Sequence, residues 1–337
     1  MSVHIRELTL PHDLDRIATL HNANRPAPAS RRRFEWSYLE NPAGMARVWA
    51  AEDEGVLVGV AAVFPRLVRL PDGTRVQAWT TGDLSVSPSH RRQGIASRLR
   101  GATRAAVDAG DSALLFAIPN AQAAGVHEKA GYWPLGSLER FVRLLALPGP
   151  ALVRAASRWP VQWLWRGCDA APLRTEVFTA DAEMPALEEV SALYERAAPA
   201  LGASVVRSAP YLRWRFLDNP RTPAHLLVVR SRGRVCGYAA VVDRGTSLYL
   251  RDWIVEDRET VPALLQAVAG LANQRRMAWI SASALQDHPH VSTLLRCGFR
   301  RRPDATAVKL YVPASSPWRD AVQAAPQWYL TGGDPDV

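Results

Sequence analysis

The sequence lacks any run of about 18 consecutive apolar residues, although hydrophobic residues make up 48% of its 337 positions. A helix that crosses a bilayer needs roughly that length, so we expect no integral membrane association. The first residues, MSVHIRE, also lack the apolar centre of a secretory signal peptide. The sequence therefore predicts a cytoplasmic location.

Cysteine is scarce as well, and its three occurrences are Cys168, Cys236 and Cys297. An odd number at wide spacing fits neither a disulfide framework nor a zinc site. We therefore expect three inert thiols and no bound metal ion.

Lysine is nearly absent, because almost all of the 41 basic residues are arginines and only Lys129 and Lys309 are lysines. The formal net charge is +9, and a basic protein attracts anionic ligands. No block of basic residues interleaved with aromatic ones appears, so we expect no nucleic-acid partner.

Two parts of the chain repeat one another, which predicts two copies of one fold. FEWSYLENP at 34–42 is matched by LRWRFLDNP at 212–220, and VWAAEDEGVLVGVAAVF at 48–64 by LLVVRSRGRVCGYAAVV at 226–242. A chain of this length suits two domains. The repeat predicts a first domain at 1–147, a linker at 148–172, a degenerate second copy at 173–313 and a tail at 314–337.

The apolar periodicity predicts both strands and helices in each copy, and hence a mixed α/β fold. Apolar runs separated by glycine, aspartate and proline mark the strands, and longer amphipathic stretches mark the helices. In the first copy we expect helices at 11–23, 93–109 and 122–129, and strands at 47–52, 56–70, 76–86, 113–118, near 132 and at 141–147.

The predicted linker contains Trp159, Trp163 and Trp165 among arginines. One interpretation is peripheral contact with a membrane surface through 151–166, since tryptophan and arginine suit the headgroup layer. The other is a helix whose tryptophans pack between the domains. We favour the second, because Pro160 interrupts the apolar face.

The segment TGDLSVSPSHRRQGIASRL at 81–99 reads as a strand, a basic turn and the start of a helix. Gly94 allows a ligand to approach the backbone closely, and the small Ala96 leaves the helix start uncluttered. The N–H groups of a first helical turn have no partners and carry partial positive charge, which favours an anion. Arg91 and Arg92 add charge beside this turn. The pattern predicts a pyrophosphate site.

These residues resemble the GNAT superfamily of acyl-CoA-dependent N-acyltransferases. The superfamily's signature is Arg/Gln-x-x-Gly-x-Gly/Ala, and Arg91, Gly94 and Ala96 match it, with Val86 and Pro88 ahead of them and AGY at 130–132 further on. The resemblance covers about residues 3–147, and the second copy extends it as fold only. It implies two GNAT-like domains, each a twisted and mostly antiparallel sheet flanked by helices, and acetyl-CoA as co-substrate. It implies these contacts with the coenzyme: Leu84, Ser85 and Val86 along the pantetheine arm; Arg91, Arg92, Gln93, Gly94, Ile95, Ala96 and Ser97 around the pyrophosphate; and Asn120.

The resemblance also suggests acid and base groups for amine acylation. Asp83 lies where the family often carries a carboxylate base, although it could instead anchor a substrate ammonium or be structural. The family often has a tyrosine four residues before the glycine of its closing Gly-Phe pair. Gly131 corresponds to that glycine here, and His127 occupies the tyrosine position. His127 could replace it as general acid, or be a solvated histidine. Tyr132 is expected to pack.

The second copy lacks the glycine turn, since its counterpart at 252–262 reads DWIVEDRETVP, whose acidic residues would repel a pyrophosphate. We therefore expect one acyl-CoA per chain. Asp252 aligns with Asp83. In the tail, Trp328 and Tyr329 could dock and present Asp334 and Asp336 to a cationic acceptor, but we favour a mobile tail.

Three functions remain open. The first is an N-acetyltransferase that acts on the amine of a small molecule or amino sugar, as a monomer or homodimer. The second is a Fem-type aminoacyl transferase, because those enzymes also use tandem GNAT-like domains. The third is a non-catalytic acyl-CoA-binding module.

Overall fold

The computed structural model describes residues 3–147, 150, 152–153, 155–157, 173–178, 184–323 and 327–335. Most of the predicted linker lies outside these residues, including its three tryptophans, and both interpretations of 151–166 stay predictions. Contacts divide the chain into two compact units. Unit 1 comprises Met1–Gly136, Thr306–Ala325 and Pro335–Val337, and unit 2 comprises Ser137–Ala305 and Pro326–Asp334.

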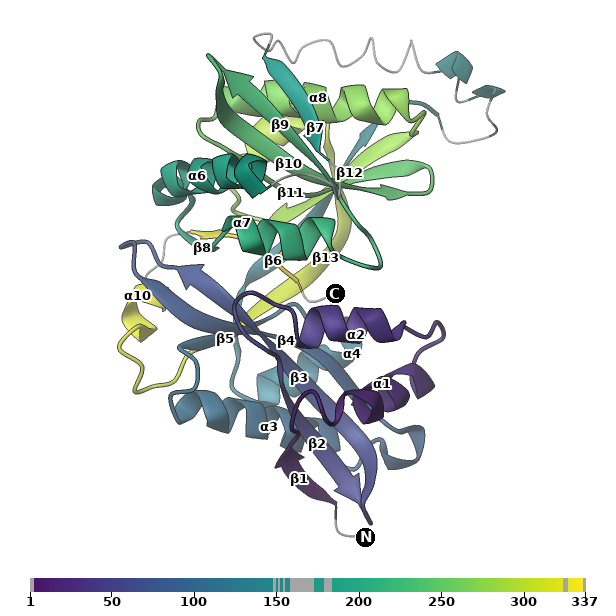
Figure 1. The fold of residues 1–337 in the computed structure, drawn as a ribbon, viewed down its shortest axis with the longest axis vertical. Coiled ribbons are helices and arrows are strands. Elements are labelled where there is room, and N and C mark those ends of the chain that lie inside the picture. The colour runs from purple at the N-terminus through teal and green to yellow at the C-terminus, as the bar shows by residue number, and fades with distance from the viewer. Residues whose placement is uncertain are drawn as a thin grey trace. The chain divides into compact units, whose positions relative to one another are not determined.

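Unit 1 contains a mixed sheet covered by helices (Figure 1). Its strands follow in the order β1 (His4–Glu7), β2 (Arg47–Asp53), β3 (Val56–Arg69), β4 (Arg75–Val86), β5 (Leu114–Ala117) and the end of β13 (Arg300–Tyr311). All described pairs are antiparallel except β4 with β5. Its helices are α1 (Leu14–Ala23), α2 (Arg31–Tyr38), the 3-10 turn η1 (Pro88–His90), α3 (Ile95–Asp108), α4 (Ala121–Lys129) and α10 (Arg319–Gln323).

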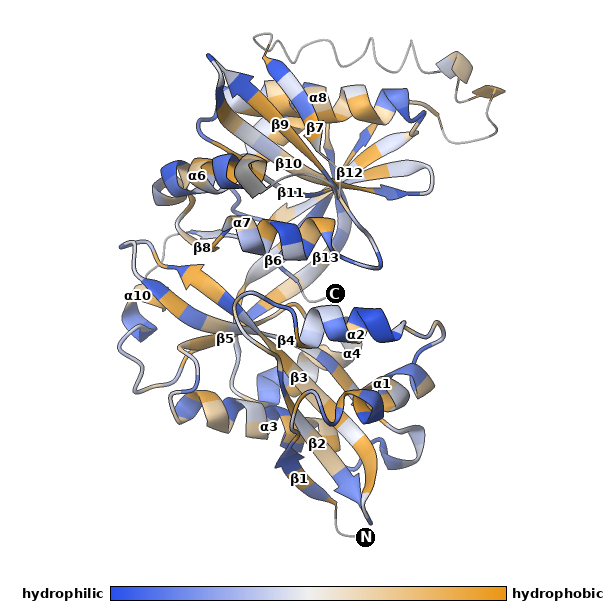
Figure 2. Cartoon of the chain, viewed as in Figure 1, coloured by the Kyte–Doolittle hydropathy of each residue, from blue (hydrophilic) through white to orange (hydrophobic). Residues whose placement is uncertain are grey.

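The sheet of unit 1 is buried on both faces, because side chains alternate along its strands. Trp49 and Ala51 of β2 pack under Leu99 of α3, whereas Val48 and Ala50 pack under α1 and α2. Strand β3 divides its side chains in the same way between the two hydrophobic clusters. Figure 2 shows hydrophobic residues along this strand and mixed colours on the covering helices. Helix α3 is thereby fixed on one face of β3 and β4.

Unit 2 has the same order and direction of strand pairing. Its strands follow in the order β7 (Arg174–Phe178), β9 (His225–Ser231), β10 (Arg234–Arg244), β11 (Ser247–Val255), β12 (Trp279–Leu285) and β6 (Trp133–Leu144), with β11 and β12 parallel. Two short strands, β8 (Ala203–Val205) and β14 (Trp328–Tyr329), pair in parallel. The helices are α6 (Met184–Leu201), α7 (Ala209–Leu212), the π-helix η2 (Arg213–Leu217), α8 (Thr260–Gln274) and α9 (Val291–Arg296).

The last strand of each sheet comes from the other half of the chain. Leu138–Leu144 of β6 pairs with β12 in unit 2, and Lys309–Tyr311 of β13 pairs with β5 in unit 1. The predicted boundaries at 147 and 173 follow the sequence repeat and therefore differ from these units. A repeat in the sequence shows which strands correspond, but it does not show which sheet a terminal strand joins.

The structure contains the three helices and the first four strands expected in the first copy, with ends shifted by a few residues. The two strands expected near 132 and at 141–147 are one continuous strand, β6, so that part of the prediction was wrong. The prediction missed β1 and α2. Strand β1 is only four residues long, and its residues are exposed or half-buried, so it lacks an apolar run. Helix α2 begins with three arginines, so the apolar face formed by Phe34 and Tyr38 is not evident from the sequence pattern. Ser30 caps this helix by accepting the Arg33 N–H at 3.3 Å.

The expectation of three inert thiols is wrong for Cys297, which is disulfide-bonded. Cys236 is a buried free thiol, as expected. None of the described helices is long and apolar enough to cross a membrane.

Candidate active site

The site begins where β4 and β5 diverge. Ala78–Thr80 of β4 pairs with Leu114–Phe116 of β5, and no further pair between these two strands is described. Strand β4 continues to Val86, paired with β3 through a bulge at which Asp83 has φ of +41°. A β-bulge bends the strand that contains it and increases its local twist. The backbone of Ser85 and Val86 is thus paired with β3 on one edge, Leu84 lies in the bulge, and none of the three has a β5 partner on the other edge.

A cavity of about 450 Å³ opens beside this unpaired edge. Its lining contains six of the residues predicted to contact the coenzyme, together with part of the loop after α1 and of helix α4. The lining residues are Asn24, Arg25, Pro26, Leu84, Ser85, Val86, Arg91, Ala96, Asn120, Ala123 and Val126. Sequence positions predicted for one ligand therefore meet at one cavity.

Helix α3 starts at this cavity without a side-chain cap. Its N-cap Gly94 has φ of +77°, and a Cβ at this position would meet nothing within 4 Å. Arg92 also has a positive φ, of +63°, so two residues of the turn before α3 have left-handed backbone conformations. The N–H groups of a first helical turn lack intrahelical acceptors and attract anions. The residues present fit a pyrophosphate.

Among the other predicted coenzyme contacts, Arg91 is already bound within the protein. Its Nε donates to the Val86 carbonyl at 3.1 Å and its Nη2 to Asn24 Oδ1 at 3.0 Å. Arg91 therefore joins the end of β4 to the end of α1. Gln93 donates to the Ser89 carbonyl at 3.2 Å. The Ile95 side chain is buried in the core, so only its backbone can face a ligand.

Asn120 caps helix α4, where its Oδ1 accepts the Ala123 N–H at 3.0 Å. It lines both the first cavity and a second cavity of about 260 Å³. The two cavities also share Arg25, Leu84 and Ala123, so they adjoin. The second is lined by Thr81, Asp83, Arg100, His127 and Pro335, among others. Both residues predicted to be catalytic are thus beside the predicted coenzyme site.

Asp83 is buried and fully engaged by side chains from α1 and α2. Arg33 donates to its two oxygens at 2.5 and 3.0 Å, and the Tyr38 hydroxyl donates to Oδ2 at 2.8 Å. His21 Nε2 lies 3.3 Å from Oδ1. Burial alone would raise the pKa of Asp83, but the Arg33 charge and the His21 contact hold it well below its usual range. This geometry favours a structural carboxylate over the predicted base, because an acid this strong accepts protons poorly.

His127 is also buried, which excludes the solvated histidine that the sequence left open. Its Nδ1 lies 2.9 Å from the Ala123 carbonyl and its Nε2 lies 3.3 Å from Thr81 Oγ1. Burial, Arg100 and Lys309 lower the pKa of His127 to about 4. The ring is therefore neutral near pH 7, so His127 does not enter the reaction already protonated, as the predicted general acid would. The Tyr132 ring packs edge-on against it at 5.0 Å, as a packing residue would.

Sequence reasoning missed several residues of this site: His21, Arg33, Tyr38, Thr81 and Arg100. Arg100 is buried and donates to the carbonyls of Ala62 and Gly82 at 3.3 and 3.2 Å, so α3 holds both strands of the bulge. Nothing in the run Arg31-Arg32-Arg33 indicates that its last arginine is buried. Among the described residues, no group of three or more His, Cys, Asp or Glu that could hold a metal ion is found.

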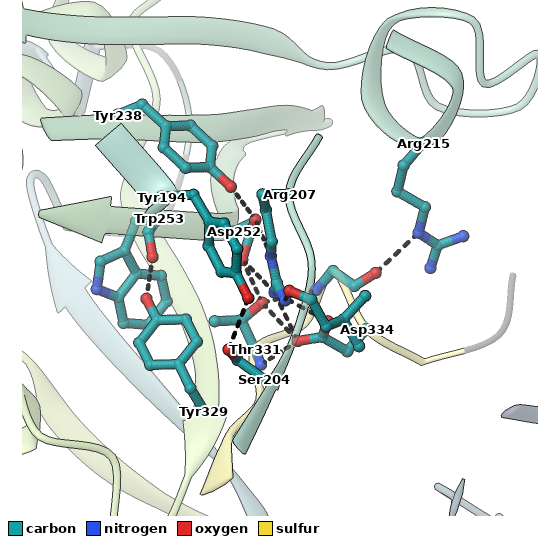
Figure 3. Close-up of polar contacts among 12 residues, drawn as sticks. Tyr194, Ser204, Arg207, Arg215, Tyr238, Asp252, Trp253, Tyr329, Thr331 and Asp334 are labelled. Carbon is teal, nitrogen blue, oxygen red and sulfur yellow. Dashed lines mark hydrogen bonds and ion pairs between the residues drawn. The ribbon is translucent and has the colours of Figure 1, made fainter. Parts of the chain in front are cut away.

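The counterpart of Asp83 in unit 2 has similar surroundings. Asp252 accepts hydrogen bonds from Arg207 at 3.1 and 3.3 Å, from the Tyr238 hydroxyl, and from Thr331 at 2.7 Å. Figure 3 shows these side chains converging on Asp252, with Asp334 beside Arg207. In both units a buried arginine and a tyrosine thus fix the carboxylate. The shared arrangement points to a structural role.

Asp334 also corrects the prediction of a mobile tail for the described part, 327–335. It is buried and lies 2.8 Å from Arg207 Nη2, and Trp328 and Tyr329 are buried with it. Docking occurs, but Asp334 faces Arg207 and is not presented to an acceptor. Asp336 lies outside the described residues.

The helix start in unit 2 has carboxylates where an anion would bind. The Asp257 carboxylate accepts the first N–H of α8, that of Thr260, at 2.8 Å, and Glu259 occupies the N-cap position. Carboxylates beside a helix start repel a second anion. The two units therefore differ in the feature that a pyrophosphate requires.

Comparison with known proteins agrees with this geometry. Residues 12–132 match the acetyltransferase (GNAT) family. No curated protein matches the chain in sequence. Among solved structures, a probable N-acyltransferase from Enterococcus faecalis is 13% identical with a TM-score of 0.68, and 93% of this chain matches 72% of that one. A GCN5-related N-acetyltransferase from Anabaena variabilis is 14% identical with a TM-score of 0.66, covering 92% of this chain and 73% of its own.

Eis1 from Mycobacterium abscessus is 17% identical with a TM-score of 0.61, covering 92% of this chain and 73% of its own. At identities this low, the matches show only a shared fold, which extends over nearly the whole chain. Residues 12–132, the part of the chain that the acetyltransferase (GNAT) family matches, include the glycine turn and the start of α3.

Proposed function

We propose that the chain transfers the acetyl group of acetyl-CoA to the primary amine of a small molecule or amino sugar, by direct attack within a ternary complex. The observation that carries the proposal is the uncapped start of α3, with its glycine turn, at a cavity bordered by the unpaired edge of β4. The GNAT match of residues 12–132 supports it.

Each part of the site has a role in this proposal. The first-turn N–H groups of α3 bind the pyrophosphate, and Arg92 adds charge beside it. The Leu84–Val86 backbone hydrogen-bonds the pantetheine arm as an added strand would. A backbone N–H at the bulge polarises the thioester carbonyl. The acetyl group then lies near the second cavity, where the amine binds.

We further propose that unit 2 is a degenerate copy that binds no coenzyme, in a protein that acts in the cytoplasm. The Asp257 carboxylate at the start of α8 supports the absence of a coenzyme site in unit 2. Acetyl-CoA is then expected to bind once per chain, which titration calorimetry measures directly. Two equivalent sites would contradict the assignment.

The site itself is tested by Gly94→Glu, which places a carboxylate where the pyrophosphate is proposed. We expect the Kd for acetyl-CoA to rise at least ~100-fold, since about 2.8 kcal/mol of binding free energy corresponds to that factor. The control is Gly110→Glu, which follows the other end of α3 with φ of +97° and equally open space. Equal affinities for both variants would refute the site.

Thiol release with a panel of amines separates this function from the alternatives. Acetyl-CoA binding without thiol release from any amine would favour a non-catalytic module. Activity restricted to aminoacyl-RNA donors would favour the Fem-type reaction, although the open helix start at Gly94 speaks for a CoA donor.

A further inference from the structure

Thr81 and His127 form a hydrogen-bonded pair at the second cavity. Thr81 lies on β4 directly after the last residue paired with β5, and His127 lies on α4. The distance from Thr81 Oγ1 to His127 Nε2 is 3.3 Å, both side chains are buried, and both line the cavity. The cavity adjoins the proposed coenzyme site.

The direction of both hydrogen bonds follows from elementary chemistry. The Ala123 carbonyl can only accept, so His127 Nδ1, 2.9 Å away, carries the proton. A neutral imidazole has one N–H, which leaves Nε2 as an acceptor. The Thr81 hydroxyl therefore donates to Nε2. Its oxygen lone pairs remain for a donor in the cavity, and an amine is such a donor.

The groups packed around His127 keep it neutral. Arg100 of α3 and Lys309 of β13 are cationic and, with burial, hold the pKa of His127 at about 4. The Lys309 ammonium also binds Glu128 at 2.5 Å, and Tyr132 presents an uncharged ring. Asp83, the carboxylate at the same cavity, is already bound by Arg33. His127 Nε2, which accepts the Thr81 hydroxyl, is therefore a neutral base that lines this cavity.

We propose that Thr81 takes a proton from the attacking amine while it passes its own proton to His127 Nε2. The proposal rests on the proposed acetyl transfer. The C–N bond forms, the C–S bond breaks, and its electron pair leaves on sulfur. The amine proton moves to Thr81 Oγ1, and the Thr81 proton moves to Nε2. The resulting imidazolium then returns a proton through Thr81 to the departing thiolate, so the overall charge balances.

A weak base suffices for this relay, because the amine proton becomes acidic only as the C–N bond forms. The same weak base then releases its proton readily, since a thiol has a pKa of about 8.5, well above that of this imidazolium. Thr81 is the catalytic residue in this scheme because it touches the amine. His127 acts through Thr81.

The test compares Thr81→Val, Thr81→Ser and His127→Gln in the full chain, with thiol release as the assay. Valine keeps the shape and removes the hydroxyl, so we expect kcat to fall ~100-fold, the lower range of general acid–base effects. Serine should restore kcat to within about tenfold of wild type, and the Kd for acetyl-CoA should stay unchanged in all three. The acidic limb of the kcat profile should disappear in His127→Gln.

Each outcome is decisive. If wild type releases thiol and Thr81→Val matches its kcat, the relay alone is refuted. If wild type releases none with any amine, the proposed function and the relay fail together. The nitrogen-15 shifts of His127 provide a check without substrate: we expect the Nδ1–H form at pH 7, and an Nε2–H form would overturn the relay.

Discussion

At the scale of residues, the carboxylate of Asp83 shows how burial and partners decide a role. Its oxygens bind Arg33, Tyr38 and His21, so the carboxylate lies directly against the charge of the buried Arg33. Removing one partner of a buried ion pair leaves the other charge in a poor solvent. The pair therefore stabilises the fold around the bulge of β4.

Asp83→Asn is accordingly expected to lower the free energy of unfolding by about 3–5 kcal/mol, as for other broken buried pairs. Urea unfolding measures this. The control is Asp15→Asn, whose carboxylate pairs with Arg31 while both side chains are 63–70% exposed, and there we expect a loss below about 1 kcal/mol. Normal stability with a selective loss of kcat would instead make Asp83 the base.

How far the sequence predicts this site depends on the separation of its residues along the chain. Arg91, Gly94 and Ala96 lie within one turn and a helix start, where local backbone chemistry links spacing to structure. Arg33 and Asp83 are 50 positions apart, and Thr81 and His127 are 46 apart. Only the folded sheet brings such pairs together, so their contacts could not be predicted from spacing.

At the scale of elements, the strands of the first copy follow from their apolar runs and the long helices from a single apolar face. Short β1 and arginine-rich α2 lack such a face in the sequence. The position of α3 depends on a further detail, the absence of a side chain on Gly59. A Cβ there would lie 3.1 Å from Ile95 Cγ2 and 3.3 Å from Leu99 Cδ1. Gly59 lets the helix that begins at Gly94 approach β3.

Gly59→Val should therefore displace the start of α3 and weaken acetyl-CoA binding more than about tenfold, or about 1.4 kcal/mol. Gly237, its counterpart in unit 2, is equally crowded, with Val229 Cγ2 at 2.9 Å from an added Cβ. Gly237→Val should destabilise the protein but leave the Kd within about twofold of wild type. Calorimetry at a temperature where both variants are folded measures the difference, and equal Kd values would contradict it.

At the scale of the whole molecule, three buried histidines control the response to acid. Burial lowers the pKa of His127 and of His290 to about 4 each, and that of His288 well below its usual value. The unfolded chain has histidines with a pKa near 6.5, so it binds more protons between about pH 4 and 6.5. The free energy of unfolding therefore decreases as the pH falls through this window.

Each histidine contributes at most about 1.4 kcal/mol per pH unit there. Burial raises the pKa of Asp334, which acts in the opposite direction, whereas partial burial lowers the pKa of His225, which acts in the same direction as the three buried histidines. We expect His288→Phe to flatten the pH dependence of urea unfolding, since His288 lies between the rings of Trp253 and Tyr329 at 4.9 and 4.6 Å. His12→Gln, whose side chain is 85% exposed, serves as control. An unchanged slope in His288→Phe would refute this account.

The origin of β13 has a consequence for biosynthesis. Strand β5 pairs with Lys309–Tyr311, which the ribosome adds long after Leu114–Ala117. At 5–20 residues per second, the nascent sheet waits roughly ten to forty seconds for this neighbour. Throughout that interval β5 presents an open edge, the kind of surface on which nascent chains associate wrongly. Translation therefore cannot complete the sheet of unit 1 before Tyr311 is made, and chaperones that shield strand edges have a defined period in which to act.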